Sequence, residues 1–222
     1  MPPPVHNSKT SDITSRRSTQ RDAVLDAAEE VILRDGIGSL TLDAVAKQAG
    51  ASKGGLLHYF PSKDALIDSL VERKLCGWRG ECTAAIERQG PGAGRVARAL
   101  LGLCLSSTDK WTEEMRRSGL VLVAALVHDP RRVEPLRDVH REITERLAED
   151  GLPPGAGEAV KMAMDGIWFG WIFGLAEMTP KRLNALREAL ERLACGGSEL
   201  APRGVDGSSP ALPDSDERSL RA

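Results

Sequence analysis

Apolar residues recur along this chain with the three- and four-residue spacing of an α-helix, not with the alternation of a strand. The first such segment has one apolar stripe, formed by Val24, Ala27, Ala28, Val31 and Ile32. Residues three, four, seven and eight apart lie on the same face of a helix. The pattern stops at Asp35-Gly36, where glycine can take the left-handed conformation that ends helices. We therefore predict an amphipathic helix that ends at Asp35.

Hydroxyl residues mark the starts of the next three predicted helices. Thr41 precedes a short helix that runs to Gln48, Ser52 precedes one that runs to about Tyr59, and Ser62 precedes a fourth. Each hydroxyl can accept a hydrogen bond from a backbone N–H group of the first turn, which otherwise has no partner. The first two of these helices have the dimensions of a helix-turn-helix, whose second helix enters the major groove of DNA.

Five more helices are predicted in the rest of the chain, over about 95–107, 110–128, 131–150, 156–178 and 180–195. Glycine or proline stands in the breaks between the last four, where these residues end helices. No convincing strand run occurs. The predicted fold class is therefore all-α, with an N-terminal three-helix domain followed by a C-terminal helical bundle.

Composition sets the expected domain boundaries. Residues 1–15 are rich in Pro, Ser and Thr, and residues 196–222 are rich in Gly, Pro, Ser and Asp, so we expect both ends to be disordered. Between them we expect a helix-turn-helix domain over 16–61 and a larger helical domain over 62–195.

Bulk charge and hydropathy exclude several classes of protein. The net charge is −2, and residues 1–63 carry eight Lys and Arg against seven Asp and Glu, so charge alone neither indicates nor excludes a nucleic-acid partner. The longest apolar run, Gly166 to Ala176, is shorter than the roughly 18 residues of a membrane span, and residues 1–14 lack the apolar core of a signal peptide. We expect a cytoplasmic protein with no membrane partner.

The cysteines do not have the spacing of a metal site. Cys76, Cys82, Cys104 and Cys195 include no CxxC pair, and three of them lie in apolar helical stretches. We interpret them as small core residues in a reducing cytosol, with a redox sensor as the alternative. No metal and no cofactor are expected.

The segment from Thr41 to Ile67 reads TLDAVAKQAGASKGGLLHYFPSKDALI, and it resembles the N-terminal domain of the tetracycline-repressor-like (TetR/AcrR) family almost position for position. The resemblance covers residues 20–70. It implies a transcriptional regulator that binds double-stranded DNA, a pseudo-palindromic operator, as a homodimer. It further implies a repressor that a small-molecule ligand releases from the operator.

The same resemblance implies a set of DNA contacts: Arg17, Arg21, Thr41, Ser52, Lys53, Gly54, Gly55, His58, Tyr59 and Lys63. Of these, Thr41, Tyr59 and Lys63 are expected at phosphates, and Lys53 or His58 at a base edge or a phosphate. The alternative for the lysines and arginines is an ordinary solvated basic face. Leu57 departs from the family, which often has an aromatic residue there.

The helix predicted over 156–178 is apolar all round, so both of its sides must be buried. We place Met162, Asp165, Phe169 and Ile172 on one side. In the family the last two long helices pair with their copies in a dimer. The resemblance therefore implies a homodimer interface formed by the opposite side and by the following leucine stripe, with Ile167, Trp171, Leu175, Leu183, Leu186 and Leu190.

The body of the family encloses a ligand cavity, and large apolar residues on several helices are candidates to line it. The expected ligand-binding residues are Trp78, Trp111, Met115, Met162, Asp165, Trp168 and Phe169, although the apolar ones also fit a plain core. A carboxylate in an apolar run is costly unless it is paired. Asp165 is therefore either part of a structural salt bridge or the counter-charge of a hydrophobic cation that stacks on an aromatic ring.

Two other functions are alternatives to a ligand-sensing regulator. An all-helical enzyme is disfavoured, because the sequence has no nucleophile elbow, no phosphate-binding loop and no cluster of metal ligands. A helix-turn-helix protein without a ligand is the second alternative. A ligand that changes DNA binding distinguishes the sensor from it.

Overall fold

The computed structural model describes residues 8–106 and 111–195, with side chains from Thr19 onward except that of Glu114. Within these ranges every regular element is helical, which confirms the predicted all-α fold. The elements are α1 (Ser8–Asp35), η1 (Ile37–Ser39), α2 (Leu42–Gln48), α3 (Lys53–Tyr59), α4 (Lys63–Arg88), α5 (Arg95–Leu105), α6 (Glu113–His128), η3 (Pro130–Val133), α7 (Glu134–Ala148), α8 (Ala156–Ile172) and α9 (Pro180–Ala194), where η denotes a short 3-10 helix.

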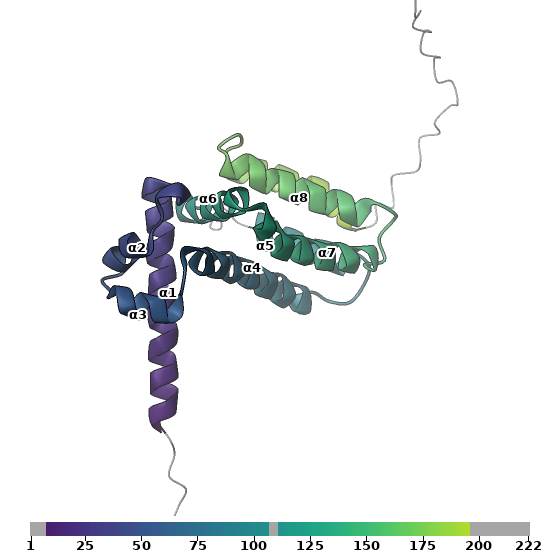
Figure 1. The fold of residues 1–222 in the computed structure, drawn as a ribbon. Helices are drawn as coiled ribbons and strands as arrows, with labels where there is room; N and C mark the ends of the chain where they lie inside the picture. Colours follow the sequence, from purple (N-terminus) through teal and green to yellow (C-terminus); the bar gives the residue numbers. More distant parts are fainter. Residues whose placement is uncertain (1–7, 107–110, 196–222) are drawn as a thin grey trace, which may run out of the picture.

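Helices α2 and α3 pack beside α1 and form a small unit with it (Figure 1). Its core contains Val24, Leu25 and Ala28 from α1, Val45 from α2 and Leu56 from α3, none of them more than 1% exposed. The tight turn between α2 and α3 requires a residue with positive φ, and Gly50 supplies it at +61°. The predicted stripe of α1 is therefore the face that α2 and α3 cover.

Helix α4 connects this unit to the body. It starts directly after the unit and runs alongside α7 (Figure 1), and it also packs against α1, α5 and α6. Ser62 caps it as predicted, with its Oγ accepting from the Ala65 N–H at 3.0 Å. One continuous helix thus belongs to both parts of the molecule.

Helix α1 is longer than the sequence led us to expect. It begins at Ser8, so the structure gives helix to residues 8–15, which we expected to be without structure. No glycine or proline lies between His6 and Asp35, so nothing in this stretch stops a helix from extending toward the N-terminus. The other segment expected to be disordered, 196–222, lies outside the described residues.

Helix α8 is shorter than expected, because it ends at Ile172 instead of 178. Gly174 takes a φ of +69°. Its N–H donates to the Trp171 carbonyl at 3.0 Å, and the Leu175 N–H donates to the Gly170 carbonyl at 2.7 Å. These two bonds are the pattern by which a left-handed glycine closes a helix. Gly174 is therefore the residue that ends the helix.

Candidate DNA-binding face and its connection to the body

The outer face of α3 is formed by four exposed residues: Lys53, Gly54, Leu57 and His58. Leu56 between them points into the core and is fully buried. The Ser52 Oγ accepts from the Gly55 N–H at 3.1 Å, and in α2 the Thr41 Oγ1 accepts from the Ala44 N–H at 3.1 Å. Both hydroxyls keep their own hydrogen to donate, so each can cap its helix and still reach a phosphate.

Several predicted DNA contacts also have partners within the chain. The Lys53 Nζ lies 2.9 Å from an Asp43 carboxylate oxygen, and both side chains are largely exposed. The Tyr59 hydroxyl donates to the Gln20 Oε1 at 3.3 Å. The Arg21 guanidinium lies over the Phe60 ring, 5.4 Å from its centroid, in a cation–π contact. These interactions hold the side chains of α3 against α1 and α2.

Lys63 is placed differently from the other predicted contacts. It is half-buried, and its Nζ donates to the Ile37 carbonyl at 3.1 Å and the Gly38 carbonyl at 3.3 Å. Its ammonium therefore ties the start of α4 to η1, a contact that the expected role at a phosphate did not include. The side chain of Arg17 lies outside those that the structure describes.

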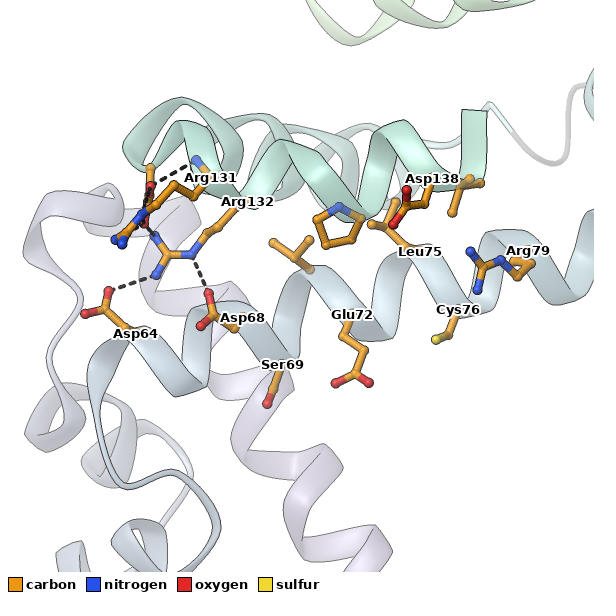
Figure 2. A pocket seen from close by; sticks show the side chains of 14 residues that line it. Asp64, Asp68, Ser69, Glu72, Leu75, Cys76, Arg79, Arg131, Arg132 and Asp138 are labelled. Atoms are coloured by element: carbon orange, nitrogen blue, oxygen red, sulfur yellow. Dashed lines mark hydrogen bonds and ion pairs between the residues drawn. The ribbon is translucent and has the colours of Figure 1, made fainter. Parts of the chain in front are cut away.

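A groove of about 720 Å³ runs between α4 on one side and η3 and α7 on the other (Figure 2). Its apolar lining comes from Val71, Leu75, Pro135 and Val139. Its polar lining consists of five carboxylates and three guanidinium groups, from Asp64, Asp68, Glu72, Asp129, Asp138, Arg79, Arg131 and Arg132, together with Ser69 and Cys76. The groove is open to solvent and carries an excess of negative charge.

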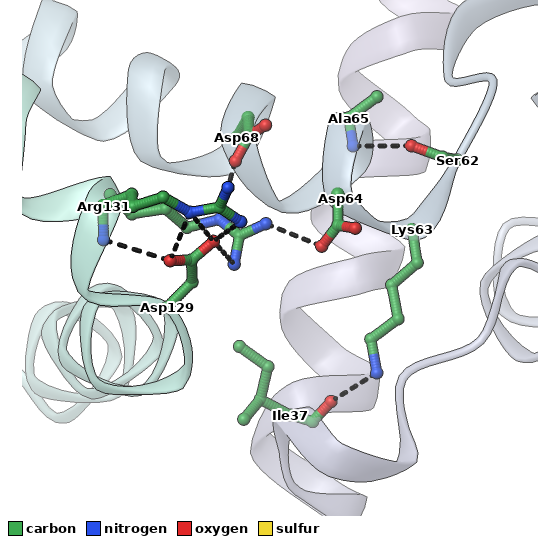
Figure 3. A network of polar contacts seen from close by, with 9 residues as sticks. Ile37, Ser62, Lys63, Asp64, Ala65, Asp68, Asp129 and Arg131 are labelled. Atoms are coloured by element: carbon green, nitrogen blue, oxygen red, sulfur yellow. Dashed lines mark hydrogen bonds and ion pairs between the residues drawn. The ribbon is translucent and has the colours of Figure 1, made fainter.

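Arg132, at one end of this groove, ties η3 to α4. It is 6% exposed, and it donates to the Asp68 carboxylate at 2.6 Å from Nε and to the Asp64 carboxylate at 2.8 Å from Nη2. Figure 3 shows Lys63 and Asp64, neighbours in the first turn of α4, reaching in different directions, toward Ile37 and toward η3. The first turn of α4 is therefore bonded both to η1, beside the α1–α3 unit, and to the body.

Asp129 caps η3 beside this contact. The side chain of Arg131 and its backbone N–H both donate to the Asp129 carboxylate, and they lower its pKa to about 2. Arg131 itself is 90% exposed. Of two consecutive arginines, one is thus bound in the interface with α4 and the other lies on the surface.

A second ionic cluster joins α1 to α4 and α6. Glu29 of α1 is 14% exposed and pairs with Arg73 and Lys74 of α4. Lys74 also donates to the Ser118 hydroxyl of α6, and Arg117 of α6 pairs with Glu30 at 3.6 Å. The α1–α3 unit is therefore held to the body at two separate places.

The seven residues predicted to bind a ligand lie away from both pockets described here. None of them lines the groove between α4 and α7 or the smaller pocket beside Glu29. Trp111 packs edge-on against Trp171 at 4.9 Å, and Trp168 packs edge-on against Phe169 at 5.1 Å. The side chains of Trp78, Met115, Met162 and Phe169 are among the exposed large apolar ones.

Asp165 has a cationic partner within its own helix. The Lys161 Nζ lies 2.6 Å from the Asp165 Oδ2 and 2.8 Å from the His140 Nδ1 of α7, and Lys161 is only 4% exposed. Burial and the Lys161 charge both lower the pKa of His140, and the Asp165 charge raises it by a smaller amount. Of the two interpretations of Asp165, the geometry agrees with the structural salt bridge. Because Lys161 already pairs with this carboxylate, a cationic ligand is not needed to balance its charge.

The exposure of the α8 residues does not follow the two sides assigned from the sequence, because Trp171 and Ile172, one from each side, are both buried. Trp171, Leu183 and Leu190 are at most 8% exposed within the single chain, so they belong to its own core and not to a dimer surface. Ile167 and Leu186 are half-buried, and Leu175, beyond the helix, is 81% exposed. The outward row of α8 instead contains Met162, Phe169 and Phe173, which are 44–56% exposed.

Among the residues that the structure describes, no helix is long and apolar enough to cross a membrane. No side-chain group of three or more potential metal ligands is found in the same part of the chain.

Comparisons with known proteins agree with this geometry. Residues 24–70 match the profile described as bacterial regulatory proteins of the tetR family, and residues 94–194 match the tetracyclin repressor-like C-terminal domain. The HTH-type transcriptional regulator RutR of Escherichia coli K12 is 36% identical over 84 residues, which are 37% of this chain and 40% of RutR. This match therefore spans less than half of the relative.

Longer matches extend over the body. The HTH-type transcriptional regulator BetI of Burkholderia mallei NCTC 10229 is 26% identical over 199 residues, which cover 84% of this chain and 96% of BetI. A crystal structure of the multidrug binding protein EbrR, complexed with malachite green, is 25% identical with a TM-score of 0.54, over 78% of this chain and 96% of that chain. Together the two profiles match more than half of the residues, one on each part of the fold. The chain therefore belongs to the TetR family of bacterial transcriptional regulators.

Proposed function

We propose that the protein is a ligand-responsive repressor that binds a pseudo-palindromic operator as a homodimer. The observation that carries the proposal is the outer face of α3, which is exposed over its whole length while the rest of the α1–α3 unit is well packed. A seven-residue helix of this kind fits a major groove, and Lys53, His58 and Thr41 supply donors for bases and phosphates.

The exposed row of α8 supports a two-fold dimer. Phe169 and Phe173 stack on each other at 6.2 Å between ring centroids, yet both are about half exposed in the single chain. Gly166 lies in the same row, and a Cβ added there would meet nothing within 4 Å, so a second helix can approach closely. A copy of the same helix covers this row in a self-complementary manner. We propose Met162, Gly166, Phe169 and Phe173 as the centre of the interface.

For the ligand, we propose the groove between α4 and α7. It touches Arg132, Asp64 and Asp68, which join α4 to the body, so a molecule bound there acts directly on the helix that carries the DNA-binding unit. Its apolar lining and its excess of two carboxylates favour a hydrophobic molecule that is neutral or cationic over an anion. The similar EbrR, a multidrug binding protein that was crystallised with malachite green, is in line with such a ligand.

DNA binding is tested by selecting duplexes from a random pool with the full chain. We expect an enriched sequence with two inverted half-sites, bound by a dimer. Recovery of no preferred sequence, or of a single unpaired half-site, contradicts the proposal.

The ligand site is tested by alkylation of cysteine. Cys76 lines the groove and Cys195 directly follows α9, and both are exposed. Neutral hydrophobes and lipophilic cations, malachite green among them, are screened for release of the selected duplex. A compound that releases the duplex should slow alkylation of Cys76 and leave that of Cys195 unchanged. Release without protection of Cys76 contradicts the groove as its site, and a panel that releases nothing favours the alternative without a ligand.

A further inference from the structure

Leu57 is the one large apolar side chain on the outer face of α3, and it is 39% exposed. The neighbouring apolar residue of the same helix, Leu56, is fully buried, so the core of the unit is complete without Leu57. Its neighbours on the outer face are Lys53, Gly54 and His58, all exposed. An apolar group therefore stands in the middle of the surface proposed to enter the major groove.

The chemistry of leucine limits what it can contact there. Its side chain has no hydrogen-bonding atom, so it gains nothing from a phosphate or from the polar edge of a base. The major groove presents one prominent apolar group, the C5-methyl of thymine. Gly54, one turn earlier, carries no side chain, and a Cβ added there would meet nothing within 4 Å, so the space beside Leu57 on the DNA side is open. The Lys53 ammonium is drawn away toward Asp43.

We propose that Leu57 is a specificity-determining residue that reads the methyl group of one thymine in each operator half-site. The inference rests on the proposed DNA-binding function. It further identifies the base that the centre of α3 selects. Burying one methyl group contributes about 0.8 kcal/mol, which is about fourfold in affinity. A dimer that makes this contact twice should therefore lose about 15-fold when both methyl groups are removed.

The experiment uses the full chain and the duplex that it selects. Each thymine is replaced in turn by uracil, in both half-sites together, since uracil keeps every hydrogen-bonding group and lacks only the methyl. For the wild-type chain we expect one position at which the replacement weakens binding by about 15-fold. For Leu57→Ala we expect weaker binding of the thymine duplex and a less than twofold difference between thymine and uracil.

Two further variants separate this role from a general one. Leu57→Met, which keeps an apolar side chain of similar length, should retain the uracil penalty. His58→Ala should bind the thymine duplex more weakly than the wild type. Its affinity should still fall by the full factor of about 15 when thymine is replaced by uracil. The inference is overturned if no thymine shows a methyl effect, or if the penalty is the same size in Leu57→Ala. Selection of no duplex at all contradicts the proposed function instead, and a selected half-site without thymine overturns this inference alone.

Discussion

Two lysines of the helix-turn-helix segment, Lys53 and Lys63, have the same chemistry and different surroundings. The Lys53 side chain is 59% exposed and its partner Asp43 is 68% exposed. Exposed ion pairs of this kind contribute only about 0–1 kcal/mol, so a phosphate can replace Asp43 at little cost. Lys63 is half-buried and donates to two backbone carbonyls, which would lose their partner if it left.

We therefore predict opposite effects for the two alanine substitutions. Lys53→Ala should weaken operator binding and lower the slope of log affinity against log salt concentration by about one unit, because one phosphate contact is lost. Lys63→Ala should instead lower the melting temperature. Asp43→Asn, the matched control, should tighten DNA binding because it frees Lys53. A salt slope that changes with Lys63→Ala and not with Lys53→Ala would reverse our assignment.

The interactions that could be predicted from the sequence are the local ones. Thr41, Ser52 and Ser62 cap their helices because a cap involves residues only three positions apart. Arg132 and its partners in α4 are 64 and 68 positions apart, so nothing in the local pattern connects them. The one available signal was the pair of carboxylates at Asp64 and Asp68, which repel each other on one helix face unless a cation lies between them.

Helix α4 is the element on which both parts of the molecule depend. Arg132 is almost completely buried and its bonds to Asp64 and Asp68 are charge-assisted, which makes them stronger than ordinary hydrogen bonds. Its neighbour Arg131 lies on the surface, where it pairs with Asp129 of its own segment. The two arginines are thus a natural comparison of a buried and an exposed guanidinium, although Asp64 and Asp68 are themselves 74% and 61% exposed.

We predict that Arg132→Ala lowers the free energy of unfolding by about 1.5–3 kcal/mol, the range for hydrogen bonds to charged groups. Arg131→Ala should change it by less than about 1 kcal/mol. Arg132→Lys should fall between them, because an ammonium does not reproduce the two-pronged geometry of a guanidinium. Denaturant unfolding measures all three, and equal losses for the two alanine variants would contradict the assigned difference.

The contact between α7 and α8 contains the group whose pKa matters near neutral pH. His140 has its pKa lowered below the ordinary 6.5 by burial and by the Lys161 charge. Below pH 6.5 the unfolded chain therefore takes up a proton more readily than the folded one. The contribution of neutral His140 to the free energy of unfolding is complete above pH 6.5. It is lost as the pH falls from 6.5 toward the lower pKa of His140 in the folded chain.

Melting temperatures at pH 7.5 and 5.5 should reveal this effect. The decrease on acidification is expected to be smaller in His140→Gln than in the wild type. His128→Gln, at an exposed site at the end of α6, should keep the wild-type decrease. Asp129 adds nothing in this range, because its pKa of about 2 keeps it ionised throughout. A decrease that is unchanged in His140→Gln would show that another group is responsible.

At the scale of the whole molecule, the sequence predicted that α8 and α9 form a dimer interface, but its pattern does not determine which side of α8 faces outward. Periodicity identifies a buried face only where a polar face opposes it, and α8 is apolar around most of its circumference. Trp171 and Phe169 are therefore equivalent in the pattern. Only the packing of α8 against α6 and α9 places Trp171 inside and Phe169 outside.

We predict that Phe169→Arg or Phe173→Arg converts the dimer to a folded monomer, because two like charges then face each other across a two-fold interface. Sedimentation and circular dichroism measure the two properties separately. Val127→Arg places the same charge at a 76% exposed position of α6 and should remain dimeric. A Phe169→Arg variant that sediments as a dimer at micromolar concentration would place the interface elsewhere.

The distribution of aromatic residues gives the two parts of the molecule different optical signals. The only tyrosine of the chain is Tyr59, in α3, whereas all four tryptophans follow the start of α4, at 78, 111, 168 and 171. Tryptophan fluorescence therefore reports on the body alone, and the close pair Trp111 and Trp171 makes it sensitive to how α8 packs. Tyr59 emits at a shorter wavelength than tryptophan, and this emission band comes from the α1–α3 unit. One unlabelled protein can thus show whether its two halves melt together or one after the other.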